Sequence, residues 1–435
     1  MFAIMKAATS ACLLLATITV SITGASANDK PILDAVEANG AEQLQLLEAS
    51  VNQNSGSLNV EGVRKVGEIY RRELEDIGFA VRWIDMPQAM ARGGHLVAER
   101  DFGDGPNLLL IGHLDTVFEP DSPFQRFERE GDKLRGPGIA DMKGGNAVVI
   151  YAMRALIDAD AIKGGKVTIF FTGDEESVGA PLAEARKDLI AAGKAADYAL
   201  NFEGGSPEWA VIGRRGSSKW KLEVTGKRAH SSGIFSDGSG AGAAFEMARI
   251  LNRFYGEVRG PLGLTFNPGM VAAGSAIEPV GSAGAVTLSG KDNVIAETAI
   301  ASGGLRFMND AQLRAAENLM RGIVEDSLPL TRATITFQDR YPAMELTKAN
   351  EALLDRLNAV HARLGLEPAK SFPPEGRGAA DISFVAPYVA SMDGLGVAGT
   401  GAHTVEEDMD LGSLQQATQR TALLVADLLG RDPEQ

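Results

Sequence analysis

Short apolar runs alternate with stretches of helical spacing along most of the chain. Three of these runs have the length and composition of buried strands, residues 108–111, 167–171 and 198–202. Apolar residues recur at the spacing of an amphipathic helix before and between the runs, in residues 36–80, 147–157 and 180–192. Buried strands that alternate with helices are typical of an α/β domain whose helices pack against a sheet.

The pattern changes near residue 214. From there the sequence predicts a strand at 219–224 and a helix at 240–255, followed by a Gly-rich stretch at 269–290 and a strand at 304–307. A helix at 310–326 and a strand at 333–337 complete this part. This order predicts a small α+β sandwich. Helical spacing returns at 349–364 and 411–430. We therefore expect residues 28–213 and 339–435 to form one catalytic domain, interrupted by an inserted domain at 214–338.

Residues 1–27 have the features of a secretory signal peptide. Lys6 precedes the apolar run 11–20, and Ala25-Ser26-Ala27 is a small-x-small cleavage site. The alternative is an uncleaved anchor, but the run is shorter than the about 20 residues that span a bilayer. We expect a periplasmic or secreted protein without a membrane segment after cleavage. Cys12, the single cysteine, would be removed with the signal.

Composition narrows the choice of partners. The 435 residues are 45% hydrophobic and 23% charged, as in a globular protein of two or three domains. The net charge of -15 disfavours binding to nucleic acid, so a small molecule or short peptide is the expected partner. Without cysteine in the mature chain, His, Asp and Glu must provide any metal ligands.

Residues of the metal-ligand type follow three predicted strands and precede one predicted helix. They are His113 after 108–111, Glu175 and Glu176 after 167–171, Glu203 after 198–202, and Asp141 before 147–157. Ligands of open α/β sheets collect beyond the carboxyl ends of the strands. One such residue at a strand end would mean little, but four such positions in successive strand–helix units predict a site.

Imidazole and carboxylate ligands without thiolate suit zinc, with manganese or cobalt as alternatives. In a two-metal site one carboxylate bridges the ions. We expect Asp141 to bridge, with His113 and Glu203 on one ion and Glu176 with a distal histidine on the other. His403, in a loop of small residues, is the expected distal ligand.

Three further residues have predicted catalytic roles. Asp115 lies two residues after His113 and could accept its second ring N–H. Glu175, adjacent to a ligand, is the expected general base. His230 lies in the inserted domain and could stabilise an oxyanion. His95 and His361 have no comparable context, and we interpret both as structural or surface residues.

Together these residues resemble the co-catalytic di-zinc exopeptidase family, which includes glutamate carboxypeptidases of the carboxypeptidase G type, aminoacylases, acetylornithine deacetylase and succinyl-diaminopimelate desuccinylase. The resemblance covers essentially the whole mature chain. It rests on the motifs Gly112-His113-Leu114-Asp115-Thr116-Val117, Gly136-Pro137-Gly138-Ile139-Ala140-Asp141-Met142-Lys143-Gly144-Gly145, Thr172-Gly173-Asp174-Glu175-Glu176, Phe202-Glu203 and the late His403.

The resemblance implies an aminopeptidase-like catalytic domain, with a mixed β-sheet between helices and two zinc ions, and an inserted lid or dimerisation domain. It gives the same roles to the residues named above: the five metal ligands, Glu175 as the general base, and Asp115 as the partner of the ligand His113. It implies a homodimer in which His230 reaches the partner subunit's active site. Arg306 and Arg340 correspond to positions that bind a substrate carboxylate, and Asn293 to a polar lid residue. The chain departs from the family at 269–291, at 293–296 and at 376–381, regions that shape the substrate pocket.

The expected reaction is hydrolysis of the amide bond to a C-terminal amino acid. Glu203, where several deacylases have Asp, favours the carboxypeptidase side of the family. Export favours scavenging of amino acids, with glutamate the expected product, from peptides, folates or N-acyl amino acids. The alternatives are an N-acyl-amino-acid amidohydrolase and a catalytically inactive binding protein of the same fold.

Overall fold

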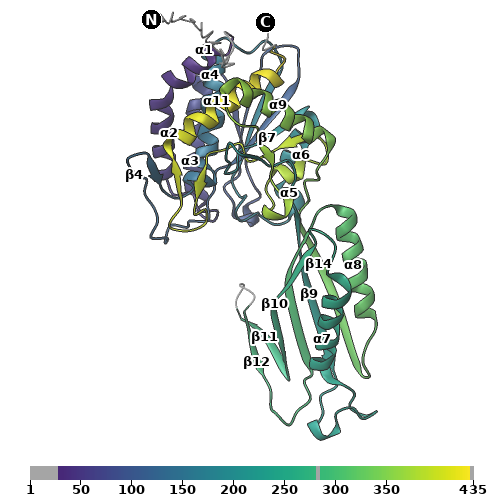
Figure 1. Cartoon of the computed structure of the whole chain (residues 1–435). Helices are drawn as coiled ribbons and strands as arrows, with labels where there is room; N and C mark the ends of the chain where they lie inside the picture. The colour runs from purple at the N-terminus through teal and green to yellow at the C-terminus, as the bar shows by residue number, and fades with distance from the viewer. Residues whose placement is uncertain (1–27, 281–284, 432–435) are drawn as a thin grey trace, which may run out of the picture.

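A computed structural model describes residues 28–280 and 285–431 in two lobes (Figure 1). The larger lobe contains both ends of the described chain. The smaller lobe is connected to it through strands β9 and β14 and extends away from it. The predicted signal peptide, residues 1–27, lies outside the described residues. Among the described residues no helix is both long and apolar enough to cross a bilayer.

The larger lobe is built on a six-stranded mixed sheet with the order β1-β2-β6-β3-β7-β16. Strands β3, β6, β7 and β16 are parallel, whereas β1 and β2 are antiparallel to their neighbours. The bounds are Ala80–Ile84 for β1, His95–Asp101 for β2, Asn107–His113 for β3, Lys166–Thr172 for β6, Tyr198–Asn201 for β7 and Ala390–Met392 for β16. The expected mixed sheet between helices is confirmed.

Helices cover both faces of this sheet. Leu108 and Leu110 of β3 belong to one apolar cluster, and Leu109 and Ile111 belong to another, because successive strand residues point to opposite faces. The first cluster contains side chains of α1 (Lys30–Ala38), α2 (Gly40–Asn52), α3 (Val60–Asp76), α4 (Gly144–Asp158), α9 (Lys348–Leu364) and α11 (Leu411–Leu428). The second contains side chains of α6 (Lys187–Ala195) and α10 (Ile382–Val385).

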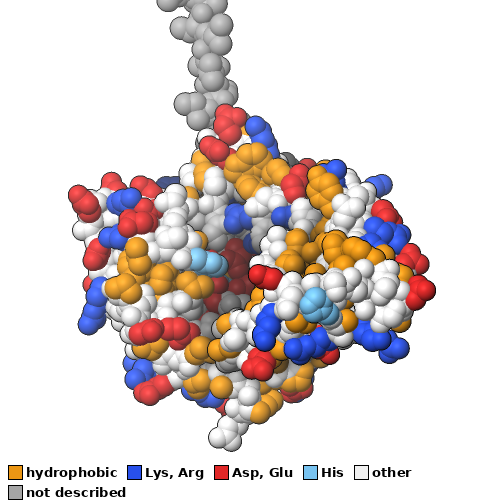
Figure 2. All heavy atoms as spheres, turned by 90° about the horizontal axis from the view of Figure 1, so that it is seen from below, with side chains coloured by type: hydrophobic (Ala, Val, Ile, Leu, Met, Phe, Trp, Pro, Cys, Tyr) orange, Lys and Arg blue, Asp and Glu red, His pale blue; other side chains and the backbone are white. Residues whose placement is uncertain are grey.

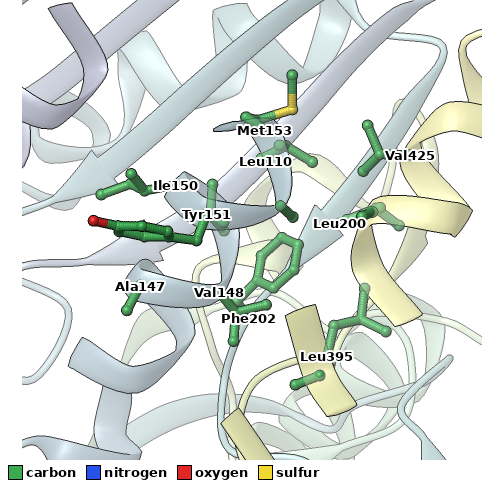
Figure 3. Close-up of a cluster of buried hydrophobic side chains, with 14 of the residues drawn as sticks. Leu110, Ala147, Val148, Ile150, Tyr151, Met153, Leu200, Phe202, Leu395 and Val425 are labelled. Carbon is green, nitrogen blue, oxygen red and sulfur yellow. The ribbon is translucent and has the colours of Figure 1, made fainter. Parts of the chain in front are cut away.

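Figure 3 shows the first cluster at close range. Val148 of α4, Val425 of α11 and Leu395 surround Leu110 and Leu200 of the sheet. All of these side chains are buried. Fully burying one such side chain contributes about 1.5–3 kcal/mol to the stability of the folded state. This layer therefore fixes the strand ends that carry the polar residues.

The smaller lobe is a four-stranded antiparallel sheet with two helices on one face. Its strand order is β10-β13-β9-β14, with bounds Thr265–Gly274 for β10, Thr298–Phe307 for β13, Gly216–Gly226 for β9 and Thr331–Tyr341 for β14. Helices α7 (Gly242–Arg253) and α8 (Asp310–Glu325) bury their apolar residues against Trp220, Leu222 and Val224 of β9. The Gly-rich stretch forms most of β10 and the paired strands β11 (Ala276–Val280) and β12 (Ala285–Ser289).

Two small sheets complete the larger lobe. One has the order β17-β18-β5-β4, with bounds Gly399–Thr400, Asp408–Asp410, Lys133–Arg135 and Glu128–Glu130. The other pairs β8 (Trp209–Ala210) with β15 (Lys370–Ser371). His403 lies in the connection between β17 and β18, so this first small sheet positions the loop of the predicted distal ligand.

The helical stretch expected at 180–192 is divided into two helices. The structure has α5 (Leu182–Ala185) and α6 (Lys187–Ala195), which meet at Arg186, whose φ of -115° is not helical. The Arg186 side chain is fully buried between two carboxylates. Its Nη1 is 2.5 Å from Asp174 Oδ1, and its Nε is 2.7 Å from Asp381 Oδ1. This cluster joins α10 to the loop after β6, a tertiary contact that overrides helical spacing.

We predict that Arg186→Met destabilises the protein by about 3–5 kcal/mol, because it leaves Asp174 and Asp381 buried without their cation. Urea unfolding would measure the loss. Lys187→Met is the matched control, since Lys187 pairs with Glu184 at the surface and exposed pairs contribute about 0–1 kcal/mol. Equal unfolding curves for the two variants would contradict the prediction.

Candidate metal centre and cleft

The predicted ligands gather at one edge of the central sheet. Strands β3, β6 and β7 are parallel neighbours, so their carboxyl ends meet at this edge. His113 is the last residue of β3, and Glu175, Glu176 and Glu203 follow β6 and β7 within a few residues. Asp141 lies in a tight turn, Ile139–Lys143, that leads into α4.

Asp141 lies between two imidazoles. Its Oδ1 is 3.2 Å from Nε2 of His113, and its Oδ2 is 3.1 Å from Nε2 of His403. Glu203 lies on the His113 side, with 3.8 Å between Oε1 and Nε2. Glu176 lies on the His403 side, with 3.1 Å between Oε2 and Nε2. The five predicted ligands therefore lie together, with Asp141 between the two imidazoles.

The donor set fits a bound metal ion. Possible ligand atoms of His113, Asp141 and Glu176 lie within 4.8 Å of one another, as do those of His113, Glu175 and Glu203. Glu176 Oε1 is buried and has no hydrogen-bond partner, as expected for an atom whose partner is an ion. Nitrogen and oxygen donors without thiolate suit zinc or another divalent transition metal.

The carboxylates of this cluster lie close enough to raise one another's pKa values. Burial and the Glu203 carboxylate raise the pKa of Glu175 well above its usual value. Burial and Asp141 do the same to the pKa of Glu203. Hydrogen bonds to Asp141 and Glu176 raise the pKa of His403 to about 11. Carboxylates packed this closely favour protonation or a bound cation, which explains why so many acids share one buried site.

Asp115 contacts both the His113 ring and the loop that carries Glu175 and Glu176. Its carboxylate accepts the backbone N–H of Glu175 at 3.0 Å, the N–H of Glu176 at 3.1 Å and the hydroxyl of Ser57 at 2.6 Å. Nδ1 of His113 lies 2.9 Å from the backbone carbonyl of Asp115 and 3.5 Å from its nearer carboxylate oxygen. Asp115 therefore orients both the His113 ring and the Glu175 loop.

Glu407 is a site residue that the sequence reasoning missed. Its buried carboxylate accepts the backbone N–H groups of Gly138, Ala140 and Asp141 at 3.1, 2.9 and 3.0 Å. It thereby fixes the turn that carries the bridging carboxylate. Its place in an acidic run four residues after His403 was the available signal, but such a run is usually solvated.

A cleft of about 360 Å³ opens beside the cluster, between the two lobes. The larger lobe contributes Glu175, Glu176 and His403, and the smaller lobe contributes Arg306 and Arg340. Figure 2 looks into a hollow whose floor is acidic. The cleft therefore places guanidinium groups opposite the candidate metal ligands.

Arg340 reaches the cleft from an irregular strand. The register of β14 against β9 shifts between Asp339 and Tyr341, so Arg340 is the extra residue of a bulge. A bulge bends the strand and redirects one side chain. Burial lowers the pKa of Arg306, and the charges of Arg215 and Arg340 lower it further.

His230 and Asn293 lie elsewhere. Ser217, near the start of β9, lines the cleft, whereas His230 lies beyond the other end of this strand at Gly226. At about 3.3 Å per residue the strand separates the two ends by roughly 30 Å. His230 is exposed, with Nδ1 2.8 Å from the Ser232 hydroxyl, and the Asn293 carbonyl accepts the N–H of Ser231 at 2.9 Å. Neither residue lies in this chain's own cleft.

The two remaining histidines are buried structural residues. The ring of His95 lies 3.1 Å from the carbonyl of Ala185 and accepts the N–H of Gly173 at 3.2 Å. His361 Nδ1 lies 2.9 Å from the carbonyl of Glu367. These contacts anchor both rings inside the larger lobe, and neither histidine is one of the predicted ligands.

Comparison with known proteins identifies the family. The model of peptidase family M20/M25/M40 matches residues 109–427 of this chain. Carboxypeptidase G2 of Pseudomonas sp. (strain RS-16) is 27% identical over 429 residues, which cover 95% of this chain and 96% of that protein.

Solved structures share the fold. Aminopeptidase PepT of Bacillus cereus has a TM-score of 0.71 at 15% identity and covers 90% of this chain and 99% of its own. The YXEP protein of Bacillus subtilis, described as a dinuclear metal binding peptidase from the M20 family, has a TM-score of 0.61 at 17% identity. The match covers 91% of this chain and 99% of the YXEP chain. The chain belongs to peptidase family M20/M25/M40 and is a hydrolase of the metallo-exopeptidase and amidohydrolase type.

Proposed function

We propose that the protein is an exported, zinc-dependent exopeptidase that releases a C-terminal amino acid, with glutamate as the preferred product. The observation that carries this proposal is the position of Arg306 and Arg340 in the same cleft as Glu175 and the candidate metal ligands. A guanidinium group binds a carboxylate through two parallel hydrogen bonds. A terminal carboxylate held there brings the preceding amide bond toward Glu175.

A third cation supports glutamate as the product. Lys219 lines the cleft together with Arg306 and Arg340. Three cations along the cleft suit a leaving group with two carboxylates better than one with a single carboxylate. The similarity to carboxypeptidase G2 over nearly the whole chain supports a carboxypeptidase.

The residues present have distinct tasks in this reaction. Glu175 takes a proton from the attacking water and later passes it to the leaving amine. His113, Asp141, Glu176, Glu203 and His403 would hold two zinc ions. When bound, these ions polarise the scissile carbonyl and lower the pKa of the attacking water. Arg306 and Arg340 hold the carboxylate and so orient the amide.

We further propose a homodimer in which His230 and Asn293 act at the partner subunit's site. Their exposure and their distance from this chain's cleft support this assignment. An exposed histidine at the tip of a rigid sheet can donate a hydrogen bond to a developing oxyanion on a neighbouring molecule. The signal-like residues 1–27 support export to the periplasm or beyond.

A screen of the zinc-loaded mature protein tests the substrate class. We expect chelator-sensitive release of glutamate from N-acyl and peptidyl glutamates, detected by mass spectrometry. The same substrates with the terminal carboxylate converted to an amide should react at least about 100-fold more slowly, because the charged partner of Arg306 and Arg340 is missing. Equal rates for acids and amides would contradict an exopeptidase, and preference for simple acyl groups on other amino acids would favour the amidohydrolase alternative.

We predict that Glu175→Gln lowers kcat by about 10²–10⁴-fold, because the amide cannot accept a proton. Zinc content, measured by atomic emission, and the unfolding midpoint should match those of the wild type. Glu184→Gln is a control on the surface of the same lobe and should keep full activity. Normal turnover by the Glu175 variant would remove this residue from the mechanism.

Mixing two inactive variants tests the role of His230. His230→Ala and Glu175→Gln should each be nearly inactive, but a mixed dimer contains one site with Glu175 and the partner's His230 both intact. Random exchange of subunits should restore about a quarter of the wild-type activity, since half the dimers are mixed and each has one complete site. No recovery in a mixture shown to exchange subunits would contradict action across the dimer.

A further inference from the structure

The peptide unit between Glu175 and Glu176 is held at both ends. The N–H of Glu176 donates to Asp115 Oδ2 at 3.1 Å. The carbonyl oxygen of Glu175 accepts the hydroxyl of Tyr341 at 2.9 Å. One peptide plane therefore joins the expected base to the expected ligand, and two side chains from different parts of the chain define its orientation.

Tyr341 is itself well fixed. It ends β14, one residue after the bulge at Arg340, and its backbone N–H lies 3.4 Å from the Ser217 hydroxyl. Its ring packs against Phe384 of α10 with 4.9 Å between the ring centres. The hydroxyl thus approaches the Glu175 carbonyl from a strand that belongs to the smaller lobe, at the wall of the cleft.

Rotation of this peptide plane would turn both neighbouring side chains. The side chains of Glu175 and Glu176 diverge from the two ends of the unit, so tilting the plane moves a base and a ligand at the same time. A misplacement of about 1 Å in a catalytic group can reduce a rate about 100-fold. Asp115 alone restrains the N–H end, and the carbonyl end depends on Tyr341.

We propose that Tyr341 is a positioning residue for the amide hydrolysis, acting through the carbonyl of Glu175 to set the direction of the base. This inference rests on the proposed function and adds a residue that no motif of the sequence singled out. It explains why the strand that provides Arg340 ends in a tyrosine whose hydroxyl points at the larger lobe. Recognition of the carboxylate and orientation of the base then depend on adjacent residues of one strand.

The test is Tyr341→Phe, which keeps the ring against Phe384 and removes one hydroxyl. We expect kcat to fall about tenfold, as the loss of one hydrogen bond that orients the base predicts, with KM within about twofold of the wild type. Amide hydrogen exchange of the segment around 173–179, followed by mass spectrometry in the full mature protein, should become faster. Tyr388→Phe is the control, since Tyr388 is exposed and its ring lies against Lys194.

The outcomes separate the inference from the proposed function. Unchanged kcat and unchanged exchange in Tyr341→Phe would overturn the positioning role. A tenfold rise in KM at constant kcat would also overturn it, because Tyr341 would then bind substrate directly. If the wild type hydrolyses none of the amides, the proposed function fails, and the exchange comparison still decides whether Tyr341 restrains the Glu175 loop.

Discussion

Asp141 and the two imidazoles beside it impose the constraint on which the rest of the site depends. One carboxylate contacts His113 through one oxygen and His403 through the other, at 3.2 and 3.1 Å. These histidines are distant in sequence and come from a strand end and from a loop of a separate small sheet. For both to meet one carboxylate, the turn 139–143 must be placed to within a fraction of an ångström.

That precision comes from backbone hydrogen bonds to two further carboxylates. Glu407 accepts three N–H groups of the turn that carries Asp141, and Asp115 accepts two from the loop that carries Glu175 and Glu176. Charged acceptors bind N–H groups about twice as strongly as neutral ones, and burial strengthens the effect. The acids around the site therefore fall into two groups, those that could face a cation and those that orient the main chain.

The part of the site that follows from local pattern could be read from the sequence, and the part that follows from tertiary contact could not. His113, Glu176 and Glu203 come directly after apolar strands, so their convergence follows from parallel pairing. Glu407 and Tyr341 act on chain segments more than 160 residues away, and no local spacing encodes such contacts. The break at Arg186 has a similar origin, since its buried side chain pairs with Asp381, which is 195 residues away, as well as with the nearer Asp174.

The smaller lobe carries two groups of predicted residues at opposite ends of one sheet. Arg306 and Arg340 lie at the cleft, whereas His230 and Asn293 lie beyond the far end of β9, roughly 30 Å away along the strand. A sheet with two helices packed on it does not bend by that distance, and its core residues are fully buried. Within one chain the two groups therefore act at different places. If both take part in one hydrolysis, the second group must come from another copy of the chain, which is why the mixed-dimer experiment tests the assembly and the mechanism together.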